Sequence, residues 1–163
     1  MASPTGTWTR ISRIDTDPTD QYFEVIQNHK LAGGGSMGEL LYSGLTEVII
    51  GSAFQVHNML GKNHSEFAYR NALVAKLRTN HLHVEVEKDV PLYFEKTLVG
   101  KQRLDILVEN KIILEIKAVK RISSDYLSKL LATLRNSRFQ LGLVINFGPS
   151  VQIRRVINSG QNQ

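Results

Sequence analysis

The stretch Arg103-Leu-Asp-Ile-Leu-Val-Glu-Asn-Lys-Ile-Ile-Leu-Glu-Ile-Lys117 decides the fold of this chain. Two short apolar runs flank the polar segment Glu109-Asn110-Lys111, whose asparagine can adopt a left-handed backbone conformation. The stretch therefore predicts a β-hairpin. Three charged residues interrupt its apolar runs: Asp105, Glu115 and Lys117.

The register of this hairpin decides whether the charged residues form a site. A three-residue loop pairs Val108 with Ile112 and brings Asp105 opposite Glu115, with Lys117 on the same face as Glu115. Opposed carboxylates repel each other, but a divalent cation between them makes the arrangement favourable. A two-residue loop would shift the pairing by one residue and send Asp105 to the other face. The alternative interpretation is a hairpin that carries charges at its edges and no site.

Composition limits the class of protein. The 163 residues suffice for one domain with a single core, and 42% of them are hydrophobic. The net charge of +5 is compatible with a polyanionic partner such as nucleic acid. The absence of cysteine excludes disulfides, thiol catalysis and zinc–thiolate sites. No apolar run reaches the roughly 18 residues that span a membrane, and no signal-peptide segment is evident, so we expect a soluble, cytoplasmic protein without a membrane partner.

The chain is expected to divide into three parts. Residues 1–36 form an N-terminal extension, in which residues 7–14 and 21–27 alternate like the strands of a β-hairpin and a glycine-rich linker follows. This extension is an appended piece, a fused segment or an upstream extension, and it should either dock on the domain or on a partner or be partly disordered. Residues 37–158 form the functional domain, and residues 159–163 form a polar tail.

The domain is expected to be α+β, a mixed sheet with helices packed on it. A helix over residues 43–60 should be capped by Ser43 or Thr46 and end at Gly61, and Ser65 should cap a second helix that runs to Thr79. The other expected elements are strands 83–87 and 91–94, a turn over 96–100, hairpin strands 102–109 and 112–119, a helix over 125–136, a buried strand 141–147 and an edge strand 151–157.

Asp105, Glu115 and Lys117 together resemble the active site of the PD-(D/E)XK nuclease superfamily. Four blocks occur in the order seen in the GxxExxR protein family of that superfamily: residues 60–73 around Glu66, residues 103–108, residues 113–119, and residues 141–148. The resemblance extends over roughly residues 45–157. It implies a restriction-endonuclease-like αβββαβ core.

The resemblance also implies a chemistry, metal-dependent phosphodiester hydrolysis of nucleic acid. Mg²⁺ or Mn²⁺ would be held by Asp105, Glu115, Glu66 and the Ile116 carbonyl, with Lys117 as the catalytic lysine. The catalytic set is therefore expected to be Asp105, Glu115, Lys117 and Glu66. Among nucleic acids, DNA is favoured over RNA.

Several positions depart from the family pattern. Asn63 and Tyr69 stand where the signature has glycine and arginine, and Lys129 and Thr133 stand where relatives carry glutamine and tyrosine. These departures keep open an alternative function, a catalytically inactive nucleic-acid-binding or protein-interaction module on a nuclease fold.

Basic residues near the motif are candidates for contacts with the nucleic-acid backbone, which would make binding salt-dependent. The other interpretation is a solvated basic face. The candidates are Lys120, Arg121, Lys129, Arg135 and Arg138.

Overall fold

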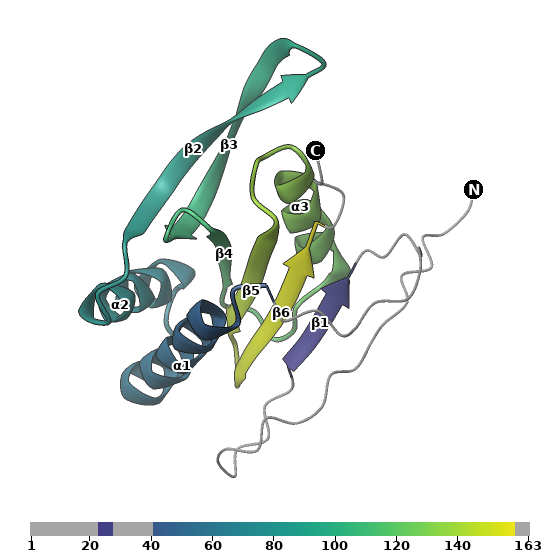
Figure 1. The fold of residues 1–163 in the computed structure, drawn as a ribbon. Coiled ribbons are helices and arrows are strands. Elements are labelled where there is room, and N and C mark those ends of the chain that lie inside the picture. The colour runs from purple at the N-terminus through teal and green to yellow at the C-terminus, as the bar shows by residue number, and fades with distance from the viewer. Residues whose placement is uncertain (1–22, 28–40, 159–163) are drawn as a thin grey trace, which may run out of the picture.

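The computed structural model describes residues 23–27 and 41–158 of the chain, which form a six-stranded sheet with helices on both faces (Figure 1). The sheet order is β1-β6-β5-β4-β3-β2. The strands are β1 (Phe23–Gln27), β2 (Val84–Phe94), β3 (Thr97–Val108), β4 (Ile112–Lys117), β5 (Leu141–Phe147) and β6 (Val151–Ile157). The helices are α1 (Ser43–Leu60), α2 (Glu66–Thr79) and α3 (Ser124–Arg135).

Two hydrophobic clusters hold the helices against the sheet. Ile112, Leu114 and Ile116 of β4 belong to the cluster beneath α1 and α2, whereas Ile113 belongs to the cluster beneath α3. This alternation follows from the two-residue period of a strand. The order α2-β2-β3-β4-α3-β5 is the predicted αβββαβ core, and the predicted α+β fold class is confirmed.

The motif hairpin has the predicted register. Val108 pairs with Ile112 across a three-residue loop, and Glu109 and Asn110 both have a left-handed φ of 52°. The loop is held to the start of β2, because the His83 N–H donates to Glu109 Oε1 at 2.7 Å and the Glu109 N–H donates to the His83 carbonyl at 2.9 Å. The turn therefore has the length that brings Asp105 opposite Glu115, as a metal site between them requires.

The β2–β3 hairpin is longer than predicted, and the turn expected over residues 96–100 is wrong. The turn is confined to Glu95 and Lys96, and Thr97 already pairs with Phe94. Residues 97–99 favour a strand, because β-branched and apolar residues fit a pleated surface even where it is exposed. We define residues 91–101 as the arm. It projects beyond the rest of the sheet (Figure 1).

The helix ends agree only in part with the prediction. The N-cap position of α1 is Tyr42, with a left-handed φ of 58° and no side-chain cap, so capping by Ser43 or Thr46 is wrong. Thr46 is buried, and its hydroxyl accepts from Arg155 Nη1 at 3.3 Å instead. The C-cap at Gly61 is confirmed, with a φ of 83° that glycine adopts without strain.

The N-terminal segment contributes an outer strand. β1 pairs in parallel with β6, so the prediction that residues 151–157 form an edge strand is wrong. Residues 1–22, 28–40 and 159–163, on which most of the predicted hairpin, the linker and the tail fall, lie outside the described residues. The domain boundary at residue 37 stays a prediction. In the part of the chain that the structure describes, no helix is long and apolar enough to cross a membrane.

Candidate active site

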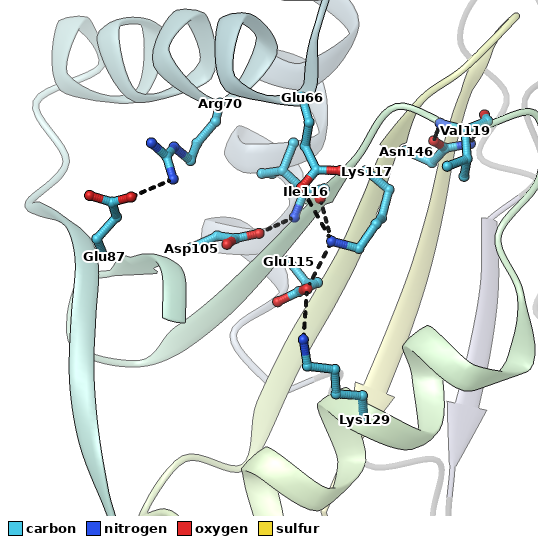
Figure 2. A network of polar contacts seen from close by, with 10 residues as sticks. All are labelled: Glu66, Arg70, Glu87, Asp105, Glu115, Ile116, Lys117, Val119, Lys129 and Asn146. Carbon is cyan, nitrogen blue, oxygen red and sulfur yellow. Dashed lines mark hydrogen bonds and ion pairs between the residues drawn. The ribbon is translucent and has the colours of Figure 1, made fainter. Parts of the chain in front are cut away.

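The charged residues singled out by the sequence come from three neighbouring elements (Figure 2). Glu66 opens α2, Asp105 lies on β3, and Glu115 and Lys117 lie at the end of β4. Ser65 fixes the start of α2 as predicted, because its hydroxyl accepts the Ala68 N–H at 3.2 Å. This cap places the Glu66 carboxylate at the positive end of the helix dipole.

The Lys117 ammonium is the centre of the cluster. It lies 2.9 Å from Glu115 Oε1 and 3.5 Å from Glu66 Oε1, and it donates to the Ile116 carbonyl at 2.8 Å. Its side chain is only 12% exposed, and the ring of Tyr126 lies 5.4 Å from Nζ. Three oxygen atoms from two elements thus converge on one largely shielded ammonium group.

These contacts shift the pKa of Lys117. Burial alone lowers it, but the hydrogen bond and charge of Glu115, with the charges of Glu66 and Asp105, together raise the pKa above its ordinary value of 10.5. Lys117 is therefore an ammonium at neutral pH. In that form it can stabilise negative charge or orient a water, and it has no lone pair to act as a general base.

Asp105 is held differently from the other acids. Its Oδ2 accepts the Ile116 N–H at 2.9 Å, so the carboxylate is tied to the backbone of the neighbouring strand. The register that pairs Ile106 with Leu114 places Asp105 beside Glu115 on the adjacent strand. The structure therefore brings Glu66, Glu115 and the Ile116 carbonyl together on Lys117, with Asp105 fixed against the same residue, Ile116.

The donor set fits a hard cation in its chemistry. In residues 41–158, no three histidine or acidic side chains are grouped so that they could hold a metal ion as they stand. The convergent groups are nevertheless all oxygen donors, carboxylates and a backbone carbonyl, which Mg²⁺ and Mn²⁺ prefer. Glu66 Oε1, Glu115 Oε1 and the Ile116 oxygen already surround a positive charge at 2.8–3.5 Å.

Two of the four positions that depart from the family pattern, Tyr69 and Thr133, have structural explanations. Tyr69 is fully buried, donates its hydroxyl to the Gly61 carbonyl at 2.7 Å and stacks on Phe147 at 4.6 Å. An arginine there would bury a charge, which is costly without a partner. Thr133 is also buried and accepts a hydrogen bond from the Gln102 amide. Its side chain therefore lies in the contact between α3 and β3.

The candidate basic residues are not equivalent. Lys129 reaches the site, with Nζ 3.9 Å from Glu115 Oε1, and its side chain is 65% exposed. Arg138 donates to Asn110 Oδ1 at 2.9 Å, at the opposite end of β4 from Lys117. Lys120, Arg121 and Arg135 are exposed on the β4–α3 connection and at the end of α3.

Two pairs of functional interest escaped the sequence reasoning. Arg70 Nη1 donates to Glu87 Oε1 at 3.1 Å, and Figure 2 shows this pair on the Asp105 side of the cluster. The only signal in the sequence is that Arg70 follows Glu66 by one helical turn. Asn146, fully buried, binds both the N–H and the carbonyl of Val119 at 2.9 Å. The second pair fixes the chain just after Lys117.

The fold agrees with the comparison to known families. A sequence model of the PD-(D/E)XK nuclease superfamily matches residues 43–156. The chain therefore belongs to the PD-(D/E)XK nuclease superfamily. No protein with a curated description and no solved structure gives a match.

Proposed function

We propose that the domain hydrolyses phosphodiester bonds of nucleic acid with the aid of Mg²⁺ or Mn²⁺, and that DNA is the substrate rather than RNA. The observation that supports this most is the convergence of Glu66, Glu115 and the Ile116 carbonyl on the Lys117 ammonium. The GxxExxR branch of the superfamily remains part of the proposal, with Tyr69 as a departure from its signature.

The metal ligands would be the carboxylates of Asp105, Glu115 and Glu66 with the carbonyl of Ile116. A bound divalent ion supplies polarisation of a phosphoryl oxygen and lowers the pKa of a bound water. The four donors sit on a capped helix or on interior strands, which hold the backbone in place. The carboxylates of Glu66 and Glu115 would exchange their contacts with Lys117 for contacts with the ion.

The protein's own part in the reaction is mainly electrostatic. Lys117, protonated at neutral pH, would orient the attacking water or offset the negative charge that grows on the phosphoryl group. Its 12% exposure matters here, because an ammonium shielded from water acts on the transition state with less screening.

A second candidate function is a catalytically inactive nucleic-acid-binding or protein-interaction module. The observation in its favour is that Lys129 and Thr133 stand where relatives carry glutamine and tyrosine, and that Thr133 is buried and hydrogen-bonded to Gln102. In such a module the acid–lysine cluster would serve the stability of the fold.

The test is cleavage of supercoiled plasmid, single-stranded DNA and RNA with Mg²⁺ or Mn²⁺. Asp105→Asn and Lys117→Ala should each lower the rate by roughly 100-fold or more, because the first weakens the proposed metal site and the second removes the positive charge beside the reacting phosphate. Asparagine is preferred at residue 105, because alanine would leave the Ile116 N–H without its acceptor.

Lys101→Ala is the matched control, because its side chain is 70% exposed on the arm. It should cut at the parent's rate. If Asp105→Asn and Lys117→Ala also cut at that rate, the assigned site is wrong. If the parent binds Mn²⁺ and nucleic acid but leaves all three substrates intact, the second candidate function is supported.

A further inference from the structure

Arg70 and Glu87 form a pair at the margin of the acid–lysine cluster (Figure 2). Arg70 lies one turn after Glu66, so both side chains leave α2 on the same face. Glu87 lies on β2 between the paired residues Val86 and Lys88 and has a left-handed φ of 51°. Figure 2 shows its carboxylate turned toward Arg70.

The register of the sheet places Glu87 in a row of acids. Paired residues of β2 and β3 lie on both sides of Glu87 and Asp105, so these two acids are opposite each other in the register. The pairing of β3 with β4 ends one residue before Asp105 and Glu115, which are next in that register. Three carboxylates on adjacent strands would repel a phosphodiester backbone. Lys117 contacts the Glu115 end of the row, and Arg70 contacts the Glu87 end.

Arg70 has more N–H donors than its one hydrogen-bond partner among the described residues uses. A guanidinium carries five N–H donors, and in the part of the chain that the structure describes Glu87 is its single hydrogen-bond partner, at 3.1 Å. Arg70 Nε is buried and has no hydrogen-bond partner there. A buried donor without an acceptor calls for an explanation, and a ligand that brings acceptors is one.

The guanidinium is also held in place before any ligand arrives. Its side chain is 14% exposed and its Cζ lies 5.2 Å from the ring centroid of Phe67, whereas Glu87 is 51% exposed. An ordered arginine loses little freedom when it binds phosphate, and an exposed carboxylate is readily displaced into water. The pair is therefore asymmetric, with a fixed cation and an exchangeable anion.

We propose that Arg70 binds a backbone phosphate of the nucleic acid at the Asp105 side of the site, and that Glu87 occupies the guanidinium until the phosphate displaces it. The proposal rests on the proposed function in that the ligand is nucleic acid. It requires neither a metal ion nor cleavage, and so it can be tested separately.

The competing explanation is structural, with the pair tying α2 to β2. The two explanations predict opposite changes in DNA affinity for one variant, Glu87→Gln. If Glu87 competes with phosphate, Glu87→Gln should tighten binding, whereas Arg70→Gln should weaken it. If the pair is only a tie, both variants remove the same contact and should act in the same direction.

The experiment is fluorescence anisotropy of a labelled 20-mer DNA, as duplex and as single strand, titrated with the full chain in EDTA at several salt concentrations. Arg70→Gln should weaken binding about tenfold, the size of one charge-assisted contact, and should reduce the slope of log K against log salt by about 0.9 for the duplex. Glu87→Gln should tighten binding about two- to fivefold. The double variant should behave like Arg70→Gln.

Lys76→Gln is the matched control, because it removes a positive charge from the last turn of the same helix. Lys76→Gln should leave the DNA affinity and the salt slope near the parent's values. The thermal midpoint of each variant shows whether it is folded. Parallel weakening by Arg70→Gln and Glu87→Gln would overturn the proposal in favour of the tie. An unchanged salt slope in Arg70→Gln, or a parent that binds neither DNA, would overturn it as well. If this binding test fails while the parent still cleaves nucleic acid with a metal ion, the role of Arg70 is wrong and the proposed function is unaffected.

Discussion

The two ends of strand β3 lie in different surroundings, and the difference explains where a site can form. The inner end, Leu104–Val108, pairs with β2 on one side and is flanked by β4 on the other, and its apolar side chains are buried. The outer end belongs to the arm and pairs with β2 alone, and Leu98 and Val99 are each 56% exposed. A strand with neighbours on both sides has its backbone and side-chain directions fixed from both sides.

The charged pairs of the two regions show the same contrast. Asp89 contacts Arg103 at 3.1 Å next to the arm, with side chains 39% and 65% exposed. Glu115 contacts Lys117 at 2.9 Å, with side chains 15% and 12% exposed. Exposed pairs contribute about 0–1 kcal/mol and exchange easily with water, whereas buried ones hold a geometry. Burial of the strand around the charges, and not charge alone, distinguishes the candidate site from the arm.

The largest difference is expected for leucines of the two ends. Leu107→Ala should lower the free energy of unfolding by about 2–5 kcal/mol, because the side chain is fully buried and its removal leaves a cavity. Leu98→Ala, the same change on the arm, should alter it by no more than about 0.5 kcal/mol. Urea denaturation of both variants measures the two values. Equal losses would mean that the arm is packed against something that covers it in solution.

Glycines offer a second, smaller comparison. A Cβ added at Gly148 would lie 2.3 Å from the Val119 carbonyl oxygen, whereas one added at Gly100 on the arm would meet no atom within 4 Å. Gly148→Ala should therefore cost about 1–3 kcal/mol and displace the chain that follows Lys117. Gly100→Ala should be neutral or stabilising by up to about 1 kcal/mol. Thermal denaturation measures the stability, and a Gly148→Ala protein as stable as the parent would contradict the close approach.

The smallest effect is a pH dependence from Lys117. Its pKa is raised in the folded protein, so its contribution to stability is complete below about pH 10.5 and is lost as the pH rises through the raised pKa. The unfolding free energy of the parent should fall more steeply above pH 10.5 than that of Lys117→Met. Lys101→Met on the arm should follow the parent. A Lys117→Met protein with the parent's steep decline would show that other groups cause it.

Much of the site could be predicted because it depends on short-range rules. The turn at residues 109–111 sets the register, the alternation along β4 separates Glu115 from Leu114, and Ser65 marks the start of α2. The errors arise where a neighbour distant in the sequence decides. The sequence predicts an edge strand at residues 151–157 because their own pattern carries no signal for β1. It predicts too short an arm because the strands of the arm pair with each other without a core.

Arg70 and Glu87 could not be found from the sequence for the same reason. They lie 17 residues apart on α2 and β2, and only the packing of that helix against that strand makes them partners. The role of Asn146 was hidden as well, since the residue it binds, Val119, is 27 positions away and offers only its backbone. A backbone group carries no signal in a sequence.

The sequence by itself determined the two strands of the motif hairpin and the loop between them, and therefore which acids stand side by side, because side-chain direction and turn length are properties of a few consecutive residues. Only the tertiary structure decided which atom each acid contacts. Glu66 and Lys117 are 51 positions apart, and the ammonium reaches both Glu66 and Glu115 because α2 begins where β4 ends in space. Contacts through space depend on how elements pack, and packing is a property of the whole core.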